Sequence, residues 1–524
     1  MDRSVAQGRR TGPSHLAPAV VVGVLAFATS WLALMPGVGF WDTAEFQAVG
    51  PLLGTAHPTG FPTYVLLGWL ASVVLQPLGE PAFRMNLLSA ICVGVAAGVT
   101  VDLVRALTRS VPIGLAAGLG LALTPIVWAI GTRADPHALH LALAAILLRL
   151  LVAWEDRVQD GSATADRYLA AAASTFGLAM GNHSLTLLLV IPVGLYVLAV
   201  DRAILHRPRL ILACLGALAI TLAVVYLELP LRAGPFRASL VYGRPDTIDG
   251  FLYVALAVQF VGSLLDPFGG LVGKIGALVD LTVAQFGILA PLIPIGFVAT
   301  AVRRPAYALL TGPAVLITCF FASSYVNADI DRYYLGPILM AWTWLAILAG
   351  VAAEGALVLL GHGEPAAPSN DGDPRPVSRV PAIVAGIAAL LLVAPALAAA
   401  DTTLTSVDRS GDRTAAVWLD HVLPVLEPNA VVISWWSYST PLWYAQLVEG
   451  RRPDIVIVDD RTRLDKNLGS ITDVIDANLG RAPVYLLRET LAAIPDLADR
   501  YDIEYLTTED QGLLIHVLGK RTSS

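Results

Sequence analysis

Two carboxylates and a histidine stand close together in residues 37–64, which read GVGFWDTAEFQAVGPLLGTAHPTGFPTY. Asp42 and Glu45 are three residues apart, so on a helical turn both side chains face the same way. His57 precedes a proline, and the stretch contains neither lysine nor arginine. An apolar run comes directly before it, and carboxylates beside hydrocarbon are costly to keep charged. Such a pair therefore indicates a functional site.

The same residues also have an ordinary structural interpretation. Asp42 could be the N-cap of a helix, with Glu45 completing an arrangement close to a capping box. His57 could belong to a simple turn. Acidic residues favour helix starts in any case, so the stretch alone leaves both interpretations open.

The composition indicates a membrane protein. Of the 524 residues, 56% are hydrophobic and 14% are charged, and the mean hydropathy is +0.67. This predicts several spanning helices with some soluble mass attached. A net charge of -7 without a basic patch argues against a nucleic-acid partner. The three cysteines fall inside expected spans and imply no disulfide framework.

Apolar runs and basic loops together predict about eleven spans. The basic first ten residues lead into an apolar run without a clear cleavage site, which we interpret as the first span, starting from the cytoplasm. Placing the arginine-rich loops inside orients the others. The expected spans are residues 16–34, 82–104, 112–130, 136–154, 168–180, 185–200, 210–227, 286–302, 307–321, 335–360 and 380–397.

The expected membrane domain covers residues 1–400, with 37–81 as its first outer loop. Residues 61–76 are expected to lie at the outer interface or over the site, because a crossing there would invert every later loop. A long outer loop is expected from 228 to about 279. Residues 361–379, rich in proline, glycine and aspartate, are expected to be a flexible cytoplasmic linker.

Residues 401–524 are expected to form an extracytoplasmic α/β domain with a mostly parallel sheet, because strand-like and helical stretches alternate there. The domain has no glycine-rich phosphate loop, so we expect no nucleotide site in it. The expected strands are residues 430–436, 454–460, 482–488, 501–508 and 513–520.

Several motifs resemble the GT-C superfamily of membrane glycosyltransferases, and more narrowly the transmembrane O-mannosyltransferase-like family, long catalogued as a domain of unknown function. In the membrane domain they are W-D-T-A-E-F, A-H-P-T-G-F-P-T-Y, A-F-R-M-N-L-L-S-A, G-L-A-M-G-N-H-S-L-T-L-L-L-V-I-P and L-P-L-R-A. The tail adds L-E-P-N-A-V-V-I-S and P-L-W-Y-A-Q-L-V-E-G-R-R-P-D. The resemblance implies transfer of a sugar, with mannose as one candidate, from a polyprenyl-phosphate donor to an extracytoplasmic hydroxyl. The acceptor could be a protein, a lipid or a cell-wall glycan, and the membrane is expected to be a bacterial plasma membrane.

The resemblance implies roles for three residues. Asp42 would be the general base that takes the acceptor proton. Glu45 would orient the acceptor or bind a divalent cation, and His57 would contact the donor phosphate or order the loop. Metal dependence stays open, because the sequence does not place the further ligands that a cation needs.

Five polar residues near outer span ends are weaker candidates for substrate binding. Asp135 stands where the family usually has glutamate before tyrosine, and a helix cap before the following proline explains it equally well. Asn182 and His183 interrupt an apolar run at the expected depth of the first loop, where packing is the alternative. Arg84 and Arg232 could pair with a lipid phosphate or simply snorkel to the interface.

Two further patterns carry weaker indications. Asp329 and Asp331 spell the D-x-D metal pattern of nucleotide-sugar transferases, but an outer loop has no nucleotide sugar, and Arg332 offers an ordinary ion pair. An aromatic group in the tail could be a glycan platform or packing against the membrane domain. It comprises Trp435, Trp436, Tyr438, Trp443 and Tyr444.

Two other classes of function compete with a transferase. A transporter or flippase for a lipid-linked substrate usually places ionisable groups near the bilayer middle and shows internal repeats, whereas the charges here lie at span ends. A membrane-anchored sensor with an external ligand-binding domain would not need the acidic pair. Substitution of Asp42 separates the three classes.

Overall fold

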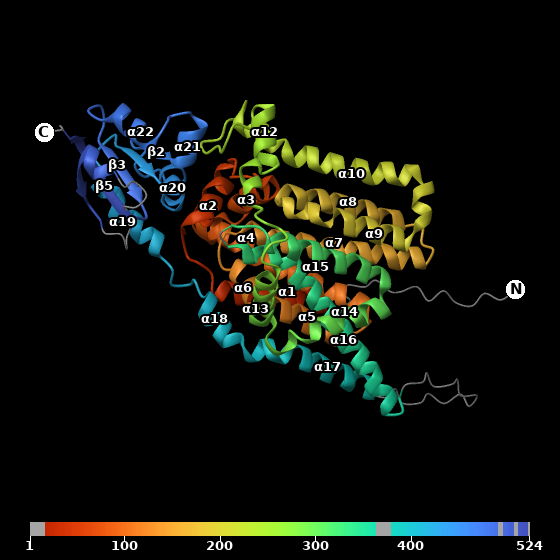
Figure 1. Cartoon of the computed structure of the whole chain (residues 1–524). Coiled ribbons are helices and arrows are strands. Elements are labelled where there is room, and N and C mark those ends of the chain that lie inside the picture. Colours follow the sequence, from red (N-terminus) through yellow and green to blue (C-terminus); the bar gives the residue numbers. More distant parts are fainter. Residues whose placement is uncertain (1–15, 328, 363–378, 491–495, 508–511, 522–524) are drawn as a thin grey trace.

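The computed structural model describes residues 16–327, 329–362, 379–490, 496–507 and 512–521, and consists of a helical bundle with a smaller α/β domain at one end (Figure 1). Among the described residues, seven helical segments are long and apolar enough to cross a membrane, and five more apolar helices are shorter. The polytopic fold with a separate C-terminal α/β domain is therefore confirmed. The expected number of about eleven spans stays a prediction.

The long helices begin as their sequences predict. Most carry proline in the first turn, where the missing N–H has no intrahelical partner to lose. The apolar windows of α4 and α7 are 78% and 83% buried, whereas that of α10 is 11% buried, so α4 and α7 form the centre of the bundle. The long helices are α4 (Pro81–Thr108), α7 (Pro136–Gln159), α10 (Pro208–Tyr226), α13 (Leu271–Phe286), α15 (Pro305–Ser323), α16 (Leu335–Leu359) and α17 (Val380–Ala398).

Shorter helices complete the membrane domain. At 13 residues, α3 is about 20 Å long, too short for a bilayer core of about 30 Å, which agrees with its expected juxtamembrane place. The shorter helices are α1 (Ala17–Leu32), α2 (Trp41–Leu52), α3 (Pro62–Val74), α5 (Val111–Leu123), α6 (Pro125–Ile130), α8 (Ala165–Asn182), α9 (Val190–Val200), α11 (Glu228–Ala233), α12 (Ile248–Ala255), α14 (Leu292–Arg303) and α18 (Ala400–Val407).

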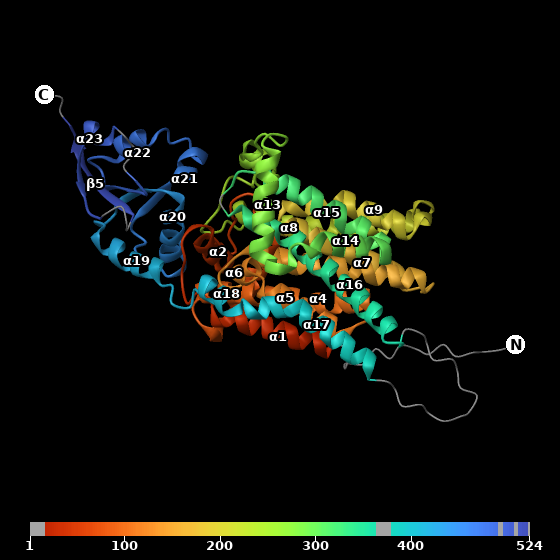
Figure 2. The same cartoon turned by 60° about the horizontal axis from the view of Figure 1, so that its bottom comes forward.

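The predicted boundaries around residue 280 were wrong. Residues 228–279 were expected to be a loop, but they contain α11, α12 and the first part of the apolar helix α13. The following span begins at Leu292 instead of residue 286. In Figure 2, α13 runs across the direction of the long helices, so an apolar helix lies where a loop was expected.

The C-terminal domain has a five-stranded sheet in the order β2-β1-β3-β5-β4. All five expected strands are present, but the sheet is only partly parallel: β1 pairs in parallel with β2 and β3, while β5 runs antiparallel to both β3 and β4. The strands are β1 (Val431–Ser434), β2 (Val456–Asp459), β3 (Val484–Arg488), β4 (Tyr501–Tyr505) and β5 (Leu513–Lys520). The helices are α19 (Thr414–Val425), α20 (Trp436–Trp443), α21 (Asp460–Asp465), α22 (Ile471–Asn478) and α23 (Leu497–Arg500).

The α/β domain packs directly on one end of the bundle, against α2. Ala44 and Ala48 of α2 share one buried apolar cluster with Leu419 and Leu442 of the domain. The Ala82 N–H at the start of α4 donates to the Tyr444 hydroxyl at 3.1 Å. This packing brings α20 against the helix that carries Asp42.

The arrangement of the ends agrees with the expected topology. The start of α1 and the adjoining ends of α16 and α17 lie at the end of the bundle opposite the α/β domain (Figures 1 and 2). Most of the expected linker, residues 363–378, lies outside the described residues. Which of the two ends faces the cytoplasm stays a prediction.

Candidate functional site

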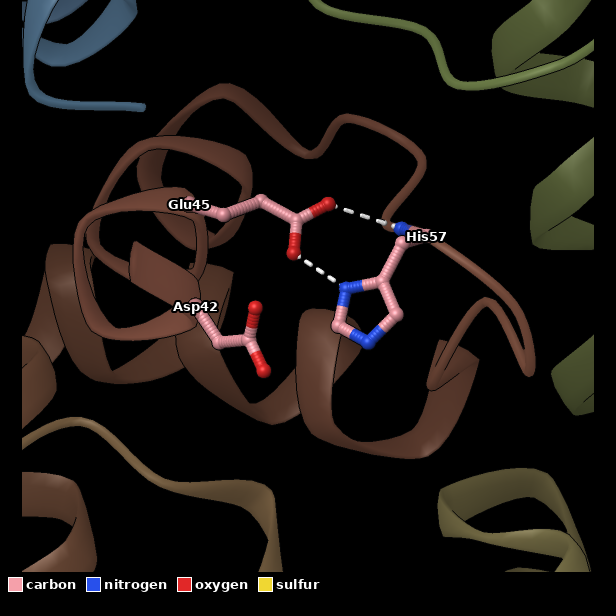
Figure 3. A group of neighbouring side chains, drawn as sticks. All are labelled: Asp42, Glu45 and His57. Carbon is pink, nitrogen blue, oxygen red and sulfur yellow. Dashed lines mark hydrogen bonds and ion pairs between the residues drawn. The ribbon is translucent and has the colours of Figure 1, made fainter. Parts of the chain in front are cut away.

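Helix α2 carries Asp42 and Glu45 on one face, as their spacing predicts (Figure 3). The capping-box alternative is wrong, because the N-cap is Phe40 and no side chain caps the helix. Glu45 is buried and Asp42 is half-buried. Both carboxylates are therefore held for interactions other than helix capping.

Glu45 and His57 hold each other. The His57 backbone N–H donates to one Glu45 oxygen at 2.7 Å, and His57 Nδ1 lies 2.5 Å from the other. The imidazole packs between the rings of Phe61 and Trp436, with centroids 5.1 and 5.9 Å away. Since the carboxylate engages both the backbone and the ring of His57, it fixes the loop and points the free Nε2 edge away from Glu45.

The pKa of His57 is raised to about 9. Burial works against the charged ring, but the nearby carboxylates of Glu45 and Asp42 outweigh it together. His57 is consequently protonated at neutral pH, and an imidazolium stands beside Asp42.

Asp42, Glu45 and His57 are also the group that could hold a metal ion, since one ligand atom from each lies within 4.8 Å of the others. Two carboxylates and one imidazole suit a divalent cation. The closest pair, Glu45 and His57, is joined by a proton, which a cation would have to displace. Ligation of one cation by both Glu45 and His57 Nδ1 would therefore replace the hydrogen bond between them.

A cavity of about 280 Å³ opens beside this group. Asp42 and His57 lie on one wall, and His183 lies in the wall formed by the start of the 3₁₀ turn η3 (Ser184–Leu189). Its apolar lining comes from several elements and includes Phe46, Phe61, Leu185, Leu187, Leu188, Leu256, Phe260, Phe321 and Tyr325. The cavity thus joins charged and apolar surfaces, as a lipid with a charged headgroup requires.

Arg332 adds a second positive charge to this cavity beside His57, and the sequence predicted only an ordinary ion pair for it. Among the described lining residues it is the only arginine or lysine. It lies in the turn η7 (Ile330–Tyr334) and donates to Asp135 at 3.1 Å and to Asp329 at 2.7 Å. Asp331 is exposed and does not line the cavity as described, so the two aspartates of D-x-D do not act together.

Asp135 has both of the roles considered for it. Its carboxylate accepts from the His137 N–H at 2.9 Å, which caps α7, and it pairs with Arg332. Burial opposes its ionisation, but Arg332 and His137 hold the pKa of the carboxyl well below its ordinary range. Asp135 is thus an anionic support beneath the cavity and is not part of its described wall.

Asn182 and His183 have different surroundings in the structure. The Asn182 amide donates to the Pro136 carbonyl at 3.0 Å and ties the end of α8 to the start of α7. His183 lines the cavity, with its ring 5.0 Å from that of His137 and 5.4 Å from that of Tyr333. Burial lowers the pKa of His183 well below its ordinary value, so the ring is neutral.

Arg84 and Arg232 do not line the cavity as the described residues define it. Arg84 donates to the carbonyls of Gly79 and Ser72 and closes the turn between α3 and α4. Arg232 donates to Leu53 at 2.7 Å and to Leu52 at 3.2 Å, which caps the end of α2. Both arginines thus bind backbone carbonyls at helix ends, and their expected role in substrate binding stays a prediction.

Trp436 is the site residue that sequence reasoning did not single out from its aromatic group. Its indole Nε1–H donates to Asp42 Oδ1 at 2.9 Å, although the two residues are 394 positions apart. Tyr444 is instead buried in the packing between the domains, and Trp435 is 37% exposed. Within the aromatic group, Trp436 therefore donates a hydrogen bond to Asp42, whereas several of the other residues pack against neighbouring side chains.

A second cavity, of about 230 Å³, lies between the two domains on the other side of Glu45. Glu45 lines this cavity, whereas Asp42 and His57 line the first one. The polar part of its wall comes from both domains and includes Arg237, Tyr242, Gln446, Asp459, Arg461, Thr462 and Asp465. The Asp42, Glu45 and His57 group thus separates a largely apolar cavity from a more polar one.

Comparison of sequences finds likeness over the membrane domain. Residues 42–205 match the family model described as the Protein O-mannosyl-transferase TMEM260 N-terminal domain. A mouse protein, Protein O-mannosyl-transferase TMEM260 from Mus musculus, is 27% identical over 365 residues, which cover 65% of this chain and 50% of the mouse protein. The chain therefore spans about half the length of this relative.

Comparison of structures finds likeness over nearly the whole chain. ArnT from Cupriavidus metallidurans bound to undecaprenyl phosphate superposes with a TM-score of 0.58 and 15% identity, covering 97% of this chain and 98% of that one. The apo form of ArnT gives a TM-score of 0.60 and 14% identity, covering 96% and 98%. The chain therefore shares the fold of ArnT over nearly its whole length, and residues 42–205 resemble the O-mannosyl-transferase TMEM260 N-terminal domain.

Proposed function

We propose that this protein is a membrane glycosyltransferase that moves a sugar from a polyprenyl-phosphate donor to a hydroxyl group outside the cytoplasm. The observation that carries the proposal is the first cavity, which lies at one end of the bundle. Its wall combines Asp42 and Arg332 with apolar side chains. Undecaprenyl phosphate bound to ArnT, a protein of the same fold, supports this class of donor. The name of the mouse relative supports mannose as the sugar and a protein as the acceptor.

In the proposed reaction, the acceptor oxygen attacks the anomeric carbon of the sugar. The bond from that carbon to the phosphate oxygen breaks, and its electron pair leaves with the polyprenyl phosphate. Asp42 takes the proton of the acceptor hydroxyl as general base. Arg332 stabilises the charge of the departing phosphate, because a guanidinium matches phosphate oxygens with paired donors.

The two cavities give donor and acceptor separate approaches. The first cavity has the apolar wall that a polyprenyl chain needs and the cation that its phosphate needs. The second is polar and lies between the domains, where a soluble acceptor can enter. Holding the two reactants on either side of the acidic group would supply much of the rate by orientation.

Substitution Asp42→Asn tests the proposal. It keeps the shape and the acceptor oxygen for Trp436 but removes the base, so turnover should fall by about 10²- to 10⁴-fold, with donor binding largely intact. The measurement is sugar transfer by purified protein from a polyprenyl-phosphate sugar, together with binding of the same donor. Asp331→Asn, an exposed residue outside the cavity, is the matched control.

Three results would argue against the proposal. Near-normal transfer by Asp42→Asn would remove Asp42 from the chemistry. Altered transbilayer movement of the lipid donor without any transfer would favour a flippase. Indifference of every activity to this substitution would favour a sensor.

A further inference from the structure

A cationic cavity of about 230 Å³ lies at the end of the bundle opposite the α/β domain. Its wall is formed by residues near the end of α4, in α7 and at the junction of α14 and α15. Four arginines face two aspartates there, so the cavity has a net positive charge. The lining residues are Asp102, Arg105, Ala106, Arg109, Arg149, Asp156 and Arg304.

Some guanidinium nitrogens of this cavity have no hydrogen-bond partner among the described residues. Asp102 accepts from Arg105 Nη2 and from Arg149 Nε, both at 2.5 Å. No partner for either Nη group of Arg149 exists among the described residues. Arg109 is exposed, and its side chain has no hydrogen bond or ion pair within the described structure. Donors suited to an anion are therefore available at the cavity mouth.

An apolar groove runs along the surface of the bundle between α1 and α4 and ends at the same charges. Its volume is about 560 Å³, and Asp102 and Arg149 line both the groove and the cationic cavity. The groove is open to the side, since Val24 and Val95 are 58% and 41% exposed. Figure 2 shows α1 at the margin of the bundle.

We propose that this groove and cavity together bind one anionic phospholipid of the leaflet at this end of the bundle. The phosphate would bind to Arg149 and Arg109, and an acyl chain would lie in the groove. The net positive charge of the cavity favours an anionic headgroup, because basic pockets between spanning helices favour anionic lipids. The groove and the cavity are continuous through Arg149, so a lipid that fills both should bind in preference to a soluble anion. The site lies at the opposite end from the proposed reaction and does not depend on it.

Native mass spectrometry of the full chain in detergent, titrated with dioleoylphosphatidylglycerol or dioleoylphosphatidylcholine, tests the site. Wild type should bind the anionic lipid about tenfold more tightly than the neutral one. Arg149→Gln and Arg109→Gln should each reduce that preference about fivefold, as expected for one arginine at a lipid surface. Arg209→Gln, an exposed arginine at the start of α10, should leave it within about twofold.

Other outcomes would overturn the proposal. Equal binding of the two lipids, or an equal loss in Arg209→Gln, would show that the arginines do not select the headgroup. Glycerol 3-phosphate binding as tightly as the lipid would show that the groove is not used. Val95→Trp, which fills the groove without changing charge, should weaken both lipids, and unchanged binding there would exclude the acyl position. Arg109→Gln keeps the test valid if Arg149→Gln disturbs folding, because the Arg109 side chain makes no hydrogen bond or ion pair in the described structure.

Discussion

At the scale of single residues, the site depends on how its charges are paired. Glu45 is committed to His57, and Asp135 is committed to Arg332 and to the start of α7. Asp42 has a different environment, because its described hydrogen-bond partner is the neutral indole of Trp436. Among these three carboxylates, Asp42 is therefore the one left available to take a proton in the cavity.

Raising the pH should destabilise the loop that carries His57. Its folded pKa of about 9 exceeds the ordinary 6.5. The stabilisation from the charged pair is therefore fully present below pH 6.5 and is lost as the pH rises through about 9. We expect the thermal unfolding midpoint of wild type to fall between pH 7 and pH 10 by more than that of His57→Gln. Equal pH dependence in the two proteins, followed by tryptophan fluorescence, would contradict the charged state of His57.

Arg332 should control donor affinity through the shape of its guanidinium. Arg332→Lys keeps the charge that buried Asp135 needs but loses the paired donors. We expect the donor KM to rise about tenfold, as for loss of one charge-assisted hydrogen bond, with little change in thermal stability. Donor titration at saturating acceptor measures it.

Asp329→Asn provides the opposite change at the same guanidinium. Asp329 is 58% exposed and competes with a phosphate for Arg332. Removing this exposed charge should therefore tighten donor binding by about two- to fivefold. If Arg332→Lys bound the donor normally, or if Asp329→Asn bound it more weakly, Arg332 would not be the phosphate ligand.

At the scale of elements, α2 connects the two domains to the site. Its N-terminal half presents Asp42 and Glu45, its small residues pack against the α/β domain, and Arg232 caps its end. The direct contact of α20 with Asp42 indicates that the C-terminal domain takes part in orienting the acidic group. Domain and site are therefore coupled through one helix.

Substitution Trp436→Phe should distinguish the hydrogen bond that orients Asp42 from the packing of the aromatic ring. It keeps an aromatic ring beside His57 but removes the N–H that donates to Asp42. We expect kcat to fall by about tenfold, as for loss of a hydrogen bond to a charged group, while donor KM stays unchanged. Trp435→Phe, at a partly exposed neighbour, is the matched control. An equal loss in both variants would assign the effect to domain packing.

The sequence predicted those features that depend on local patterns. Hydropathy predicted a polytopic helical fold, three-residue spacing placed Asp42 and Glu45 on one face, and alternating apolar residues located all five strands. Contacts between residues far apart in the sequence could not be predicted from local sequence patterns. Trp436 meets Asp42 only because the two domains pack together. The backbone carbonyls that Arg84 and Arg232 bind were not predictable either, because a span-end arginine can bind a backbone carbonyl as well as a lipid. The transverse helix α13 was missed because hydropathy does not report helix direction.

At the scale of the whole molecule, the two ends of the bundle differ in charge, and one of them carries the α/β domain. The α/β domain and the acidic site occupy one end, and the cationic cavity occupies the other (Figure 1). Loops at the second end contain the arginine pairs at 303 and 304 and at 207 and 209. Lysine and arginine collect in cytoplasmic loops, so this asymmetry predicts that the site and the α/β domain lie outside the cytoplasm.

Labelling of introduced cysteines tests this orientation directly. In a background with the three native cysteines changed to alanine, Ser410→Cys reports the start of the α/β domain, and Ala163→Cys reports the loop between α7 and α8. Both positions are exposed in the structure, so access of the reagent depends on the side of the membrane. A membrane-impermeant maleimide added to intact cells should label Ser410→Cys and spare Ala163→Cys until the cells are broken. Labelling of Ala163→Cys alone in intact cells would invert the topology and place the acidic site in the cytoplasm. A donor sugar would then have to be presented on the inner leaflet, and the proposed extracytoplasmic transfer would be excluded.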